Sequence, residues 1–159
     1  MEILLLAVIA VLAVLGSGQF GLFDRILSPG PISPVEFAEL ALPKSPNAYL
    51  VGPKGYTTAL PHADAPEFAI SVNELKSRVN AIAHGERRVT KVWESEDGLE
   101  LQYIQRSFLM RYPDIVSVKL IPLGEARSTL IIYSRSVYGY SDLGVNKARV
   151  NRWLAELQN

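Results

Sequence analysis

The sequence predicts an α+β protein, in which an N-terminal transmembrane helix precedes a small domain with an antiparallel four-stranded sheet packed against helices. Three observations lead to this expectation. The chain begins with an apolar run, eight of its ten prolines fall between Pro29 and Pro66, and the rest alternates between helical and strand-like patterns. We therefore divide the chain into a transmembrane anchor (1–24), a proline-rich extended segment packed on the domain (25–67) and a globular α+β domain (68–159).

The apolar run occupies residues 3–15, which at 1.5 Å per residue cover only about 20 Å of a hydrocarbon core about 30 Å thick. Continuing the helix to Phe23 gives about 31 Å, and Asp24 and Arg25 then end it. An uncleaved anchor fits this length best. A cleaved signal peptide, which lacks its basic flank here, and a buried helix of a soluble protein are the alternatives. Small residues could pack this helix against another membrane helix: Gly16, Ser17, Gly18 and Gly21.

The proline-rich segment should be extended, because each proline fixes φ and removes a backbone donor. A short helix is expected at 34–40, with Ser33 as its cap and proline at its first position. The segment is too apolar to be a free linker. Its bulky side chains need cover, together with the one at the start of the domain: Tyr49, Leu50, Val51, Tyr56 and Phe68.

The globular domain should begin and end with a helix. Ser71 and Glu74 form a capping box, and Gly85 is placed to end the helix that follows. The last helix, at about 145–158, carries one apolar stripe: Val150, Trp153, Leu154 and Leu157. Between the helices lie four strand-like segments joined in pairs by turns at 95–98 and 122–125: residues 88–94, 99–105, 114–121 and 127–135.

The composition excludes several classes of function. Sixteen Lys and Arg balance sixteen Asp and Glu, which argues against a general nucleic-acid binder. The absence of cysteine excludes thiol catalysis and thiolate metal sites. A serine triad would need His62 or His84, and His84 is better explained by its place at a helix C-terminus. We therefore expect no enzyme, no catalytic residue, no metal and no cofactor.

Two polar clusters are the candidate sites. The first precedes and enters the last helix, where hydroxyls, a guanidinium and helix N–H groups could hold an anion: Ser134, Arg135, Ser136, Ser141, Asp142 and Asn146. The alternative is that Ser141 or Asp142 caps the helix and Arg135 pairs with an acid.

The second cluster consists of Arg106, Arg111 and Asp114 around the apolar stretch 108–110. It predicts either a membrane-surface or partner-binding patch, or a buried bend in which Asp114 pairs with Arg111. A hydrolase that uses Asp142 or Asp114 with a serine is a third, weaker hypothesis for the two clusters.

A set of motifs runs through both clusters: Gln105-Arg106-Ser107, 109–114, 127–130, 133–136 and 139–146, followed by Arg149 and Trp153-Leu154. Over about residues 45–157 they resemble the bacterial domain-of-unknown-function 1499 family. The resemblance implies a hydrophobic N-terminal segment and a domain outside the cytoplasm. Many relatives have a cysteine after the pair that corresponds to Pro46-Asn47, whereas here Ala48 follows, so a redox role is not supported. The family assigns no reaction.

These observations predict a non-catalytic, single-pass protein of the inner membrane with its domain on the periplasmic side. We expect an accessory or assembly subunit of a larger membrane complex. Its partners would be membrane lipid and other membrane-protein subunits, and no nucleic acid. Thirteen Lys and Arg against nine Asp and Glu from Lys76 onward suit a weak attraction to anionic lipid. The alternative function is binding of a small anionic or lipid-like ligand at the cluster before the last helix.

Overall fold

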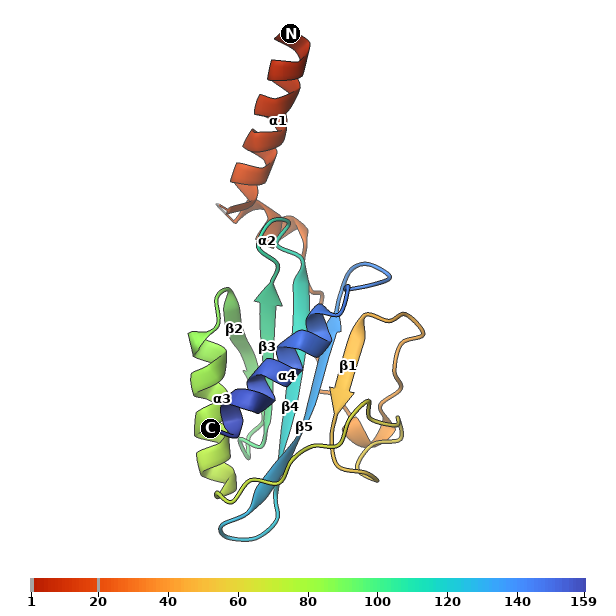
Figure 1. The fold of residues 1–159 in the computed structure, drawn as a ribbon, viewed down its shortest axis with the longest axis vertical. Helices are drawn as coiled ribbons and strands as arrows, with labels where there is room; N and C mark the ends of the chain where they lie inside the picture. The colour runs from red at the N-terminus through yellow and green to blue at the C-terminus, as the bar shows by residue number, and fades with distance from the viewer. Residues whose placement is uncertain (1, 20) are drawn as a thin grey trace.

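The computed structural model describes residues 2–19 and 21–159, apart from five side chains: Leu15, Ser17, Gly18, Gln19 and Leu22. Within this part of the chain, a five-stranded antiparallel sheet forms the centre of the domain, in the order β1-β5-β4-β3-β2 (Figure 1). Its strands are β1 (Ala48–Val51), β2 (Val89–Glu94), β3 (Glu100–Arg106), β4 (Pro113–Pro122) and β5 (Ser128–Ser136). The α+β architecture and the antiparallel pairing are therefore as expected.

The predicted number of strands is wrong, because β1 adds a fifth strand at the edge of the sheet. It pairs with β5, with Ala48 opposite Arg135 and Val51 opposite Ile132. The strand lies in the segment that we expected only to be extended. Flanking prolines keep this stretch extended, and pairing with β5 buries Leu50 and Val51 completely. A run of four residues between prolines is too short to show a strand pattern by itself.

The predicted transmembrane helix is also wrong. Among the described residues, no helix has both the length and the apolar character to cross a bilayer. Helix α1 (Glu2–Gln19) has 18 residues and is about 27 Å long. The predicted span continues to Phe23, but Gly21 has a left-handed φ of 84° and a separate helix, α2 (Leu22–Ile26), follows it. The span also includes Phe20, which lies outside the described residues.

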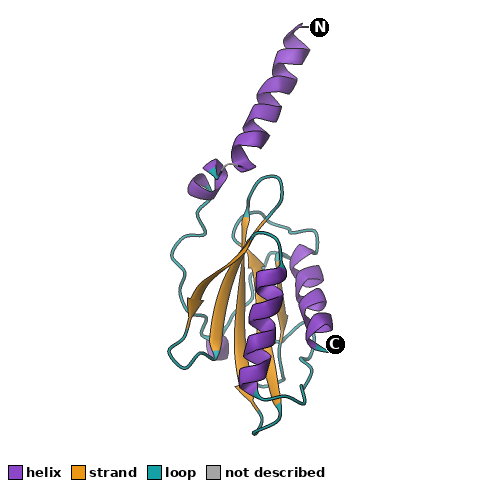
Figure 2. Ribbon diagram, turned by 90° about the vertical axis from the view of Figure 1, so that its left-hand side faces the viewer, coloured by secondary structure: helices purple, strands orange, loops and turns teal. Residues whose placement is uncertain are grey.

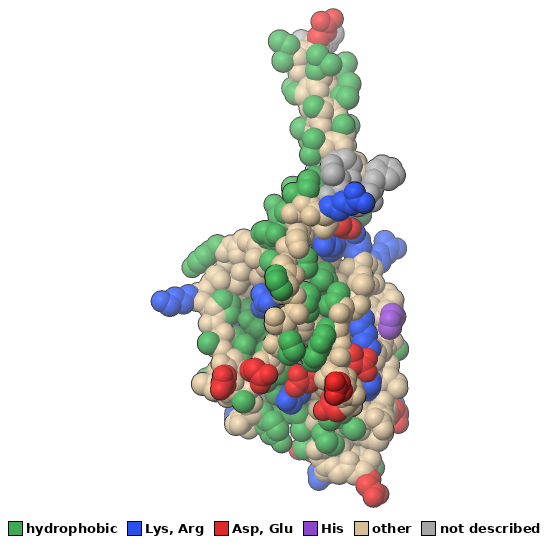
Figure 3. All heavy atoms as spheres, turned by 180° about the vertical axis from the view of Figure 1, so that it is seen from behind, with side chains coloured by type: hydrophobic (Ala, Val, Ile, Leu, Met, Phe, Trp, Pro, Cys, Tyr) green, Lys and Arg blue, Asp and Glu red, His purple; other side chains and the backbone are tan. Residues whose placement is uncertain are grey.

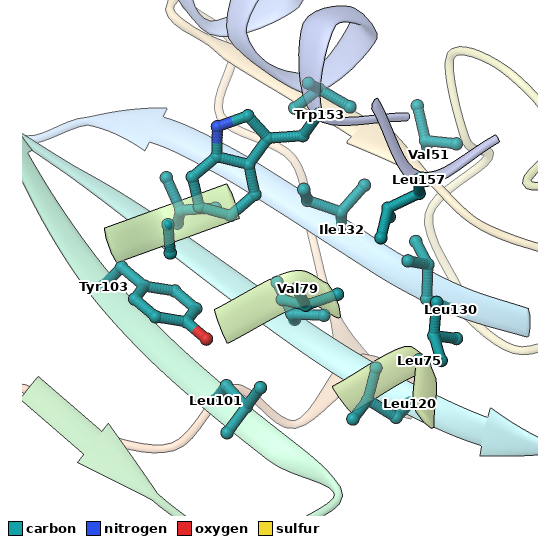
Figure 4. Packing of buried hydrophobic residues seen from close by; sticks show 14 of the residues in the cluster. Val51, Leu75, Val79, Leu101, Tyr103, Leu120, Leu130, Ile132, Trp153 and Leu157 are labelled. Atoms are coloured by element: carbon teal, nitrogen blue, oxygen red, sulfur yellow. The ribbon is translucent and has the colours of Figure 1, made fainter. Parts of the chain in front are cut away.

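Two helices cover one face of the sheet (Figures 1 and 2). Helix α3 (Val72–Gly85) begins at the expected cap, where the Ser71 hydroxyl accepts a hydrogen bond from the Glu74 N–H at 3.2 Å. Helix α4 (Val145–Leu157) ends within two residues of its expected end. The Trp153 ring meets the Tyr103 ring edge-on, at 5.7 Å between centroids, in the core between helices and sheet (Figure 4).

The other face of the sheet is covered by the chain from 28 to 46 (Figure 2). The helix expected at 34–40 is only a single 3₁₀ turn, η1 (Phe37–Glu39), and Ser33 does not cap it. Instead, the Ser33 carbonyl accepts a hydrogen bond from Gln102 at 2.9 Å. Phe37 packs here with Leu50, Ile121, Ile131 and Tyr133. Of the bulky side chains expected to need cover, Tyr56 is the exposed exception.

Helix α1 extends away from the domain (Figure 1). Apart from Glu2, its described large side chains are apolar and exposed: Ile3, Leu4, Leu5, Leu6, Val8, Ile9, Val11, Leu12 and Val14. Because consecutive residues 3–6 are among them, the exposed apolar surface surrounds the helix instead of forming one stripe.

Candidate functional site

Two polar side chains lie on the buried stripe of α4. Asn146 and Arg149 are buried beside Val150 and Trp153, with Arg149 only 3% exposed. A buried charged residue needs a partner, because its desolvation is costly. The centre of the candidate site is therefore the set of groups that satisfies these two side chains.

Arg149 donates four hydrogen bonds, to three strands and to its own helix. Its Nη2 donates to Asp114 Oδ2 on β4 at 2.6 Å, and this ion pair is almost fully buried. Its Nη1 donates to Ser134 Oγ on β5 at 2.8 Å and to Asn146 Oδ1 on its own helix at 2.6 Å. Its Nε donates to Gln105 Oε1 on β3. Arg149 thus joins α4 to the three central strands.

Asn146 extends the network toward β1. Its Nδ2 donates to Ser136 Oγ and to the Asn47 carbonyl, each at 3.0 Å, and its Oδ1 also accepts from Ser134 Oγ at 2.6 Å. Asn47 Nδ2 in turn donates to the Gly139 carbonyl at 2.8 Å. Residues that carry the family resemblance thus form one connected network under the loop before α4.

The loop before α4 is organised by capping, as the alternative interpretation expects. Asp142 accepts hydrogen bonds from the N–H of Gly144 at 3.0 Å and of Asn146 at 2.7 Å. Ser141 Oγ accepts from the Leu143 N–H at 3.3 Å. The carboxylate of Asp142 therefore serves the start of the helix.

A pocket of 390 Å³ opens beside Arg149. We call it the arginine pocket; its lining residues are Arg88, Gln105, Arg106, Ser107, Phe108, Asp114, Val145, Ala148, Arg149 and Arg152. Four arginines and one aspartate thus line the same pocket. Arg152 is also paired with Glu86 at 2.5 Å, outside the lining.

Arg88 contributes an uncompensated charge to this pocket. Its Nε donates to the Arg106 carbonyl at 3.0 Å, and its guanidinium lies 5.3 Å from the centre of the Phe108 ring. It has no ion pair with any described acidic residue. The arginine pocket therefore carries an excess of positive charge.

The second predicted cluster is divided by the structure. The expected pair of Asp114 with Arg111 is not formed, because Asp114 pairs with Arg149. Arg111 instead donates two parallel hydrogen bonds to the carboxylate of Asp24, of 2.9 and 2.8 Å. Arg106 donates to the Leu27 carbonyl at 3.1 Å. Both arginines therefore fasten the chain after α1 to the domain.

The paired hydrogen bonds from Arg111 lower the pKa of Asp24. The hydrogen bond from Arg111 is the largest cause, and the nearby charges of Arg106 and Arg111 act in the same direction, against the effect of partial burial. The same contact raises the pKa of Arg111. Asp24 is therefore ionised throughout the neutral pH range, where its ion pair with Arg111 holds the chain after α1 on the domain.

Arg135 lies outside the network formed by Ser134 and Asn146. With Ser136 it lines a groove of 370 Å³ whose other walls come from the chain that covers the opposite face of the sheet: Val35, Leu40, Ala41, Leu42, Pro43, Ser45, Asn47 and Tyr133. Alternation along β5 explains the separation, since Arg135 follows Ser134 and successive strand residues point to opposite faces.

Four side chains that line the arginine pocket are outside the predicted set of site residues and can donate hydrogen bonds through an amide or guanidinium group: Arg88, Gln105, Arg149 and Arg152. One sequence signal was available for Arg149. It falls on the same helical stripe as Val150 and Trp153, where a charged residue indicates a buried polar contact. No comparable signal marks Arg88 and Arg152, because only the tertiary fold brings them to the pocket.

Two further observations concern possible metal ligands and the small residues of the N-terminal segment. Within residues 2–19 and 21–159, no group of three or more His, Cys, Asp or Glu side chains is arranged to hold a metal ion. Gly16 and Gly21 have open space around them, whereas the side chains of Ser17 and Gly18 are outside the described set. Packing of these four residues on another helix stays a prediction.

Comparison with known proteins gives one match. Residues 27–157 match the model of a family described as "Protein of unknown function (DUF1499)". This is most of the chain, and it confirms the family to which the motifs pointed. No curated protein and no solved structure matches the sequence. The bacterial source and the periplasmic placement of the domain stay predictions.

Proposed function

Because the chain belongs to the DUF1499 family, whose function is unknown, we propose a function from its own geometry: it binds a small anionic ligand in the arginine pocket. The expected chemistry is a phosphate or carboxylate group. The observation that carries the proposal is that four arginines line one cavity together with a single acidic residue. Arginine presents several N–H donors in a planar fork that fits both kinds of oxyanion.

Arg149 is the pre-oriented donor of the pocket. Its guanidinium has five N–H groups, of which four are used by Gln105, Ser134, Asn146 and Asp114. One N–H of Nη2 is left for a ligand. Since the side chain is already fixed by the network, binding to it costs little side-chain entropy.

The same contacts favour binding over catalysis. Asp114 is neutralised by a buried arginine, and Asp142 accepts two backbone hydrogen bonds at the start of α4. These contacts engage both carboxylates within the fold, and none of them joins either carboxylate to a serine hydroxyl, as a serine hydrolase would need. We therefore propose a binding protein without a hydrolytic role.

Calorimetric titration with inorganic phosphate at low ionic strength tests this proposal. Arg88→Gln removes a pocket charge that has no acidic partner, so affinity should fall about tenfold, the lower end of the effect of a charge-assisted hydrogen bond. Arg127→Gln is the matched control, because Arg127 is an exposed arginine paired with Glu67 elsewhere. Equal affinity of the two variants, or no phosphate binding by the unaltered chain, would contradict the proposal.

A second function, as an accessory subunit of a larger complex, is favoured by α1. Its apolar side chains are exposed on all sides, and an apolar surface of another molecule must cover them in the cell. We propose that another subunit does so. The full chain, purified gently from its native source, should then carry a stoichiometric partner that Leu12→Asp removes and Leu60→Asp, at an exposed position of the domain, retains. Retention of the partner by Leu12→Asp would contradict this role.

A further inference from the structure

Exposed apolar side chains gather at one end of the domain. Two loops carry them: 107–112, between β3 and β4, and 137–144, between β5 and α4. Both loops lie at the end from which α1 extends (Figure 1). We call their exposed apolar residues the apolar rim: Phe108, Leu109, Tyr112, Tyr138, Tyr140 and Leu143.

The rim is unusual within this chain. Leu143 is 94% exposed and Tyr140 is 75% exposed. Among the described residues beyond α1 and this end, only three other large apolar side chains are exposed: Tyr56, Leu60 and Val92. Leu143 also has a left-handed φ of 54°, a strained conformation for leucine. The fold therefore holds apolar groups outward at this end without burying them against itself.

Positive charge accompanies the rim. The three segments that meet at this end, residues 22–27, 105–113 and 137–147, contain four basic and two acidic residues: Arg25, Arg106, Arg111 and Lys147 against Asp24 and Asp142. On the face shown in Figure 3, Lys and Arg side chains lie near the junction with α1, and a band of Asp and Glu lies further down the domain.

We propose that this end of the domain rests on an anionic lipid surface. Aromatic rings with polar tips, exposed leucines and flanking arginines are the composition that settles at the boundary between headgroups and acyl chains. The apolar groups stand on two projecting loops, and all except Phe108 lie outside the arginine pocket, which suits a flat, deformable surface better than a rigid protein. The excess of positive charge selects anionic lipid.

The apolar rim is adjacent to the arginine pocket, but the proposed lipid contact does not depend on anion binding in the pocket. Phe108 belongs both to the rim and to the lining of the pocket, so an anion in the pocket would lie beside the lipid headgroups. The lipid-facing role rests on the rim and its charges alone. It therefore stands or falls separately from phosphate binding.

A fluorescence measurement on the full chain tests the lipid surface. The chain has no cysteine, so Leu143→Cys provides one unique site for a polarity-sensitive dye, and Leu60→Cys provides a matched exposed site away from the rim. The probes are vesicles of phosphatidylcholine alone and of phosphatidylcholine with an equal amount of phosphatidylglycerol. We expect a blue shift at position 143 with the mixed vesicles, weakened by salt, and no shift at position 60.

Two results would overturn the proposal. The absence of a shift at position 143 with the mixed vesicles would assign the rim to a protein partner. An equal shift with phosphatidylcholine alone would remove the selection for anionic lipid. The calorimetric titration with phosphate, with Arg88→Gln as its variant, is read separately and decides only the pocket.

Discussion

Replacing Asp114 with asparagine should destabilise the domain strongly. The substitution preserves shape but removes the negative charge that faces Arg149, whose side chain is 4% exposed and whose partner is 13% exposed. Removing one member of a buried ion pair leaves the other charge uncompensated and costs about 3–5 kcal/mol. This is a large share of the roughly 5–15 kcal/mol that stabilises a typical domain.

Urea unfolding, followed through the fluorescence of the buried Trp153, measures this cost. Glu67→Gln is the matched control, because it breaks a pair with Arg127 in which both side chains are about two-thirds exposed, and it should cost less than about 1 kcal/mol. The double variant Asp114→Leu with Arg149→Met should recover most of the lost free energy of unfolding, since apolar residues of similar volume replace buried pairs with little loss.

The reasoning is refuted if Asp114→Asn unfolds within about 1 kcal/mol of the unaltered chain, which is the range of an exposed pair. That result would mean that Arg149 finds water or another acceptor when its carboxylate is lost. The buried network would then not be a fixed base for the pocket.

Three further predictions concern the attachment of α1, a turn and the core. The pKa of Asp24 lies below its ordinary value of 3.8, so the ion pair stabilises the docked segment 22–27 fully at pH values above 3.8. The stabilisation is lost only as the pH falls through the lowered pKa. Amide hydrogen exchange of the segment, measured as a function of pH, tests this loss. Gly98→Ala should cost about 1 kcal/mol in urea unfolding, because φ is 69° there and side chains crowd the new methyl group, whereas Gly85→Ala, with open space, should cost nothing. Trp153→Ala should cost about 3–5 kcal/mol in urea unfolding followed by circular dichroism, since the variant lacks the fluorescent side chain, and a value near zero would contradict the assigned core.

The parts of the fold that follow local patterns were predictable from the sequence. The cap at Ser71, the stripe of α4 and the alternation in β3 depend on residues close in sequence, and the structure places each within a few residues of its expected position. Strand β1 depends instead on a distant strand, β5, because four extended residues become a strand only when their hydrogen bonds are satisfied. The sequence alone could not supply that partner.

The end of α1 shows the same limit. Hydropathy favours continuing one helix to Phe23, because the intervening residues are small or weakly polar. The helix does not continue because Gly21 has a left-handed backbone conformation, which glycine adopts without strain. The two hydrogen bonds from Arg111 to Asp24 then hold the following residues on the domain. Neither could be inferred from a count of apolar residues.

The candidate site was predicted in part. The sequence placed Ser134 and Asn146 in one cluster and Asp114 in another, whereas the structure joins all three in one network. Their common partner is Arg149, which was outside the predicted set. Arg135 has the same residue type and a similar place in the sequence, but strand alternation sends it to the other face. Residue type and proximity therefore identified the region, and only the fold identified the pocket.

The most direct test of the central claim, that an anion binds among these arginines, is a titration with inorganic phosphate followed by the NMR signals of the arginine Nε–H groups. We predict saturable shifts for Arg88, Arg106 and Arg149, which line the pocket, and none for Arg127. Shifts at Arg127 as large as those at Arg88, Arg106 and Arg149, or no shift at these three, would contradict the account.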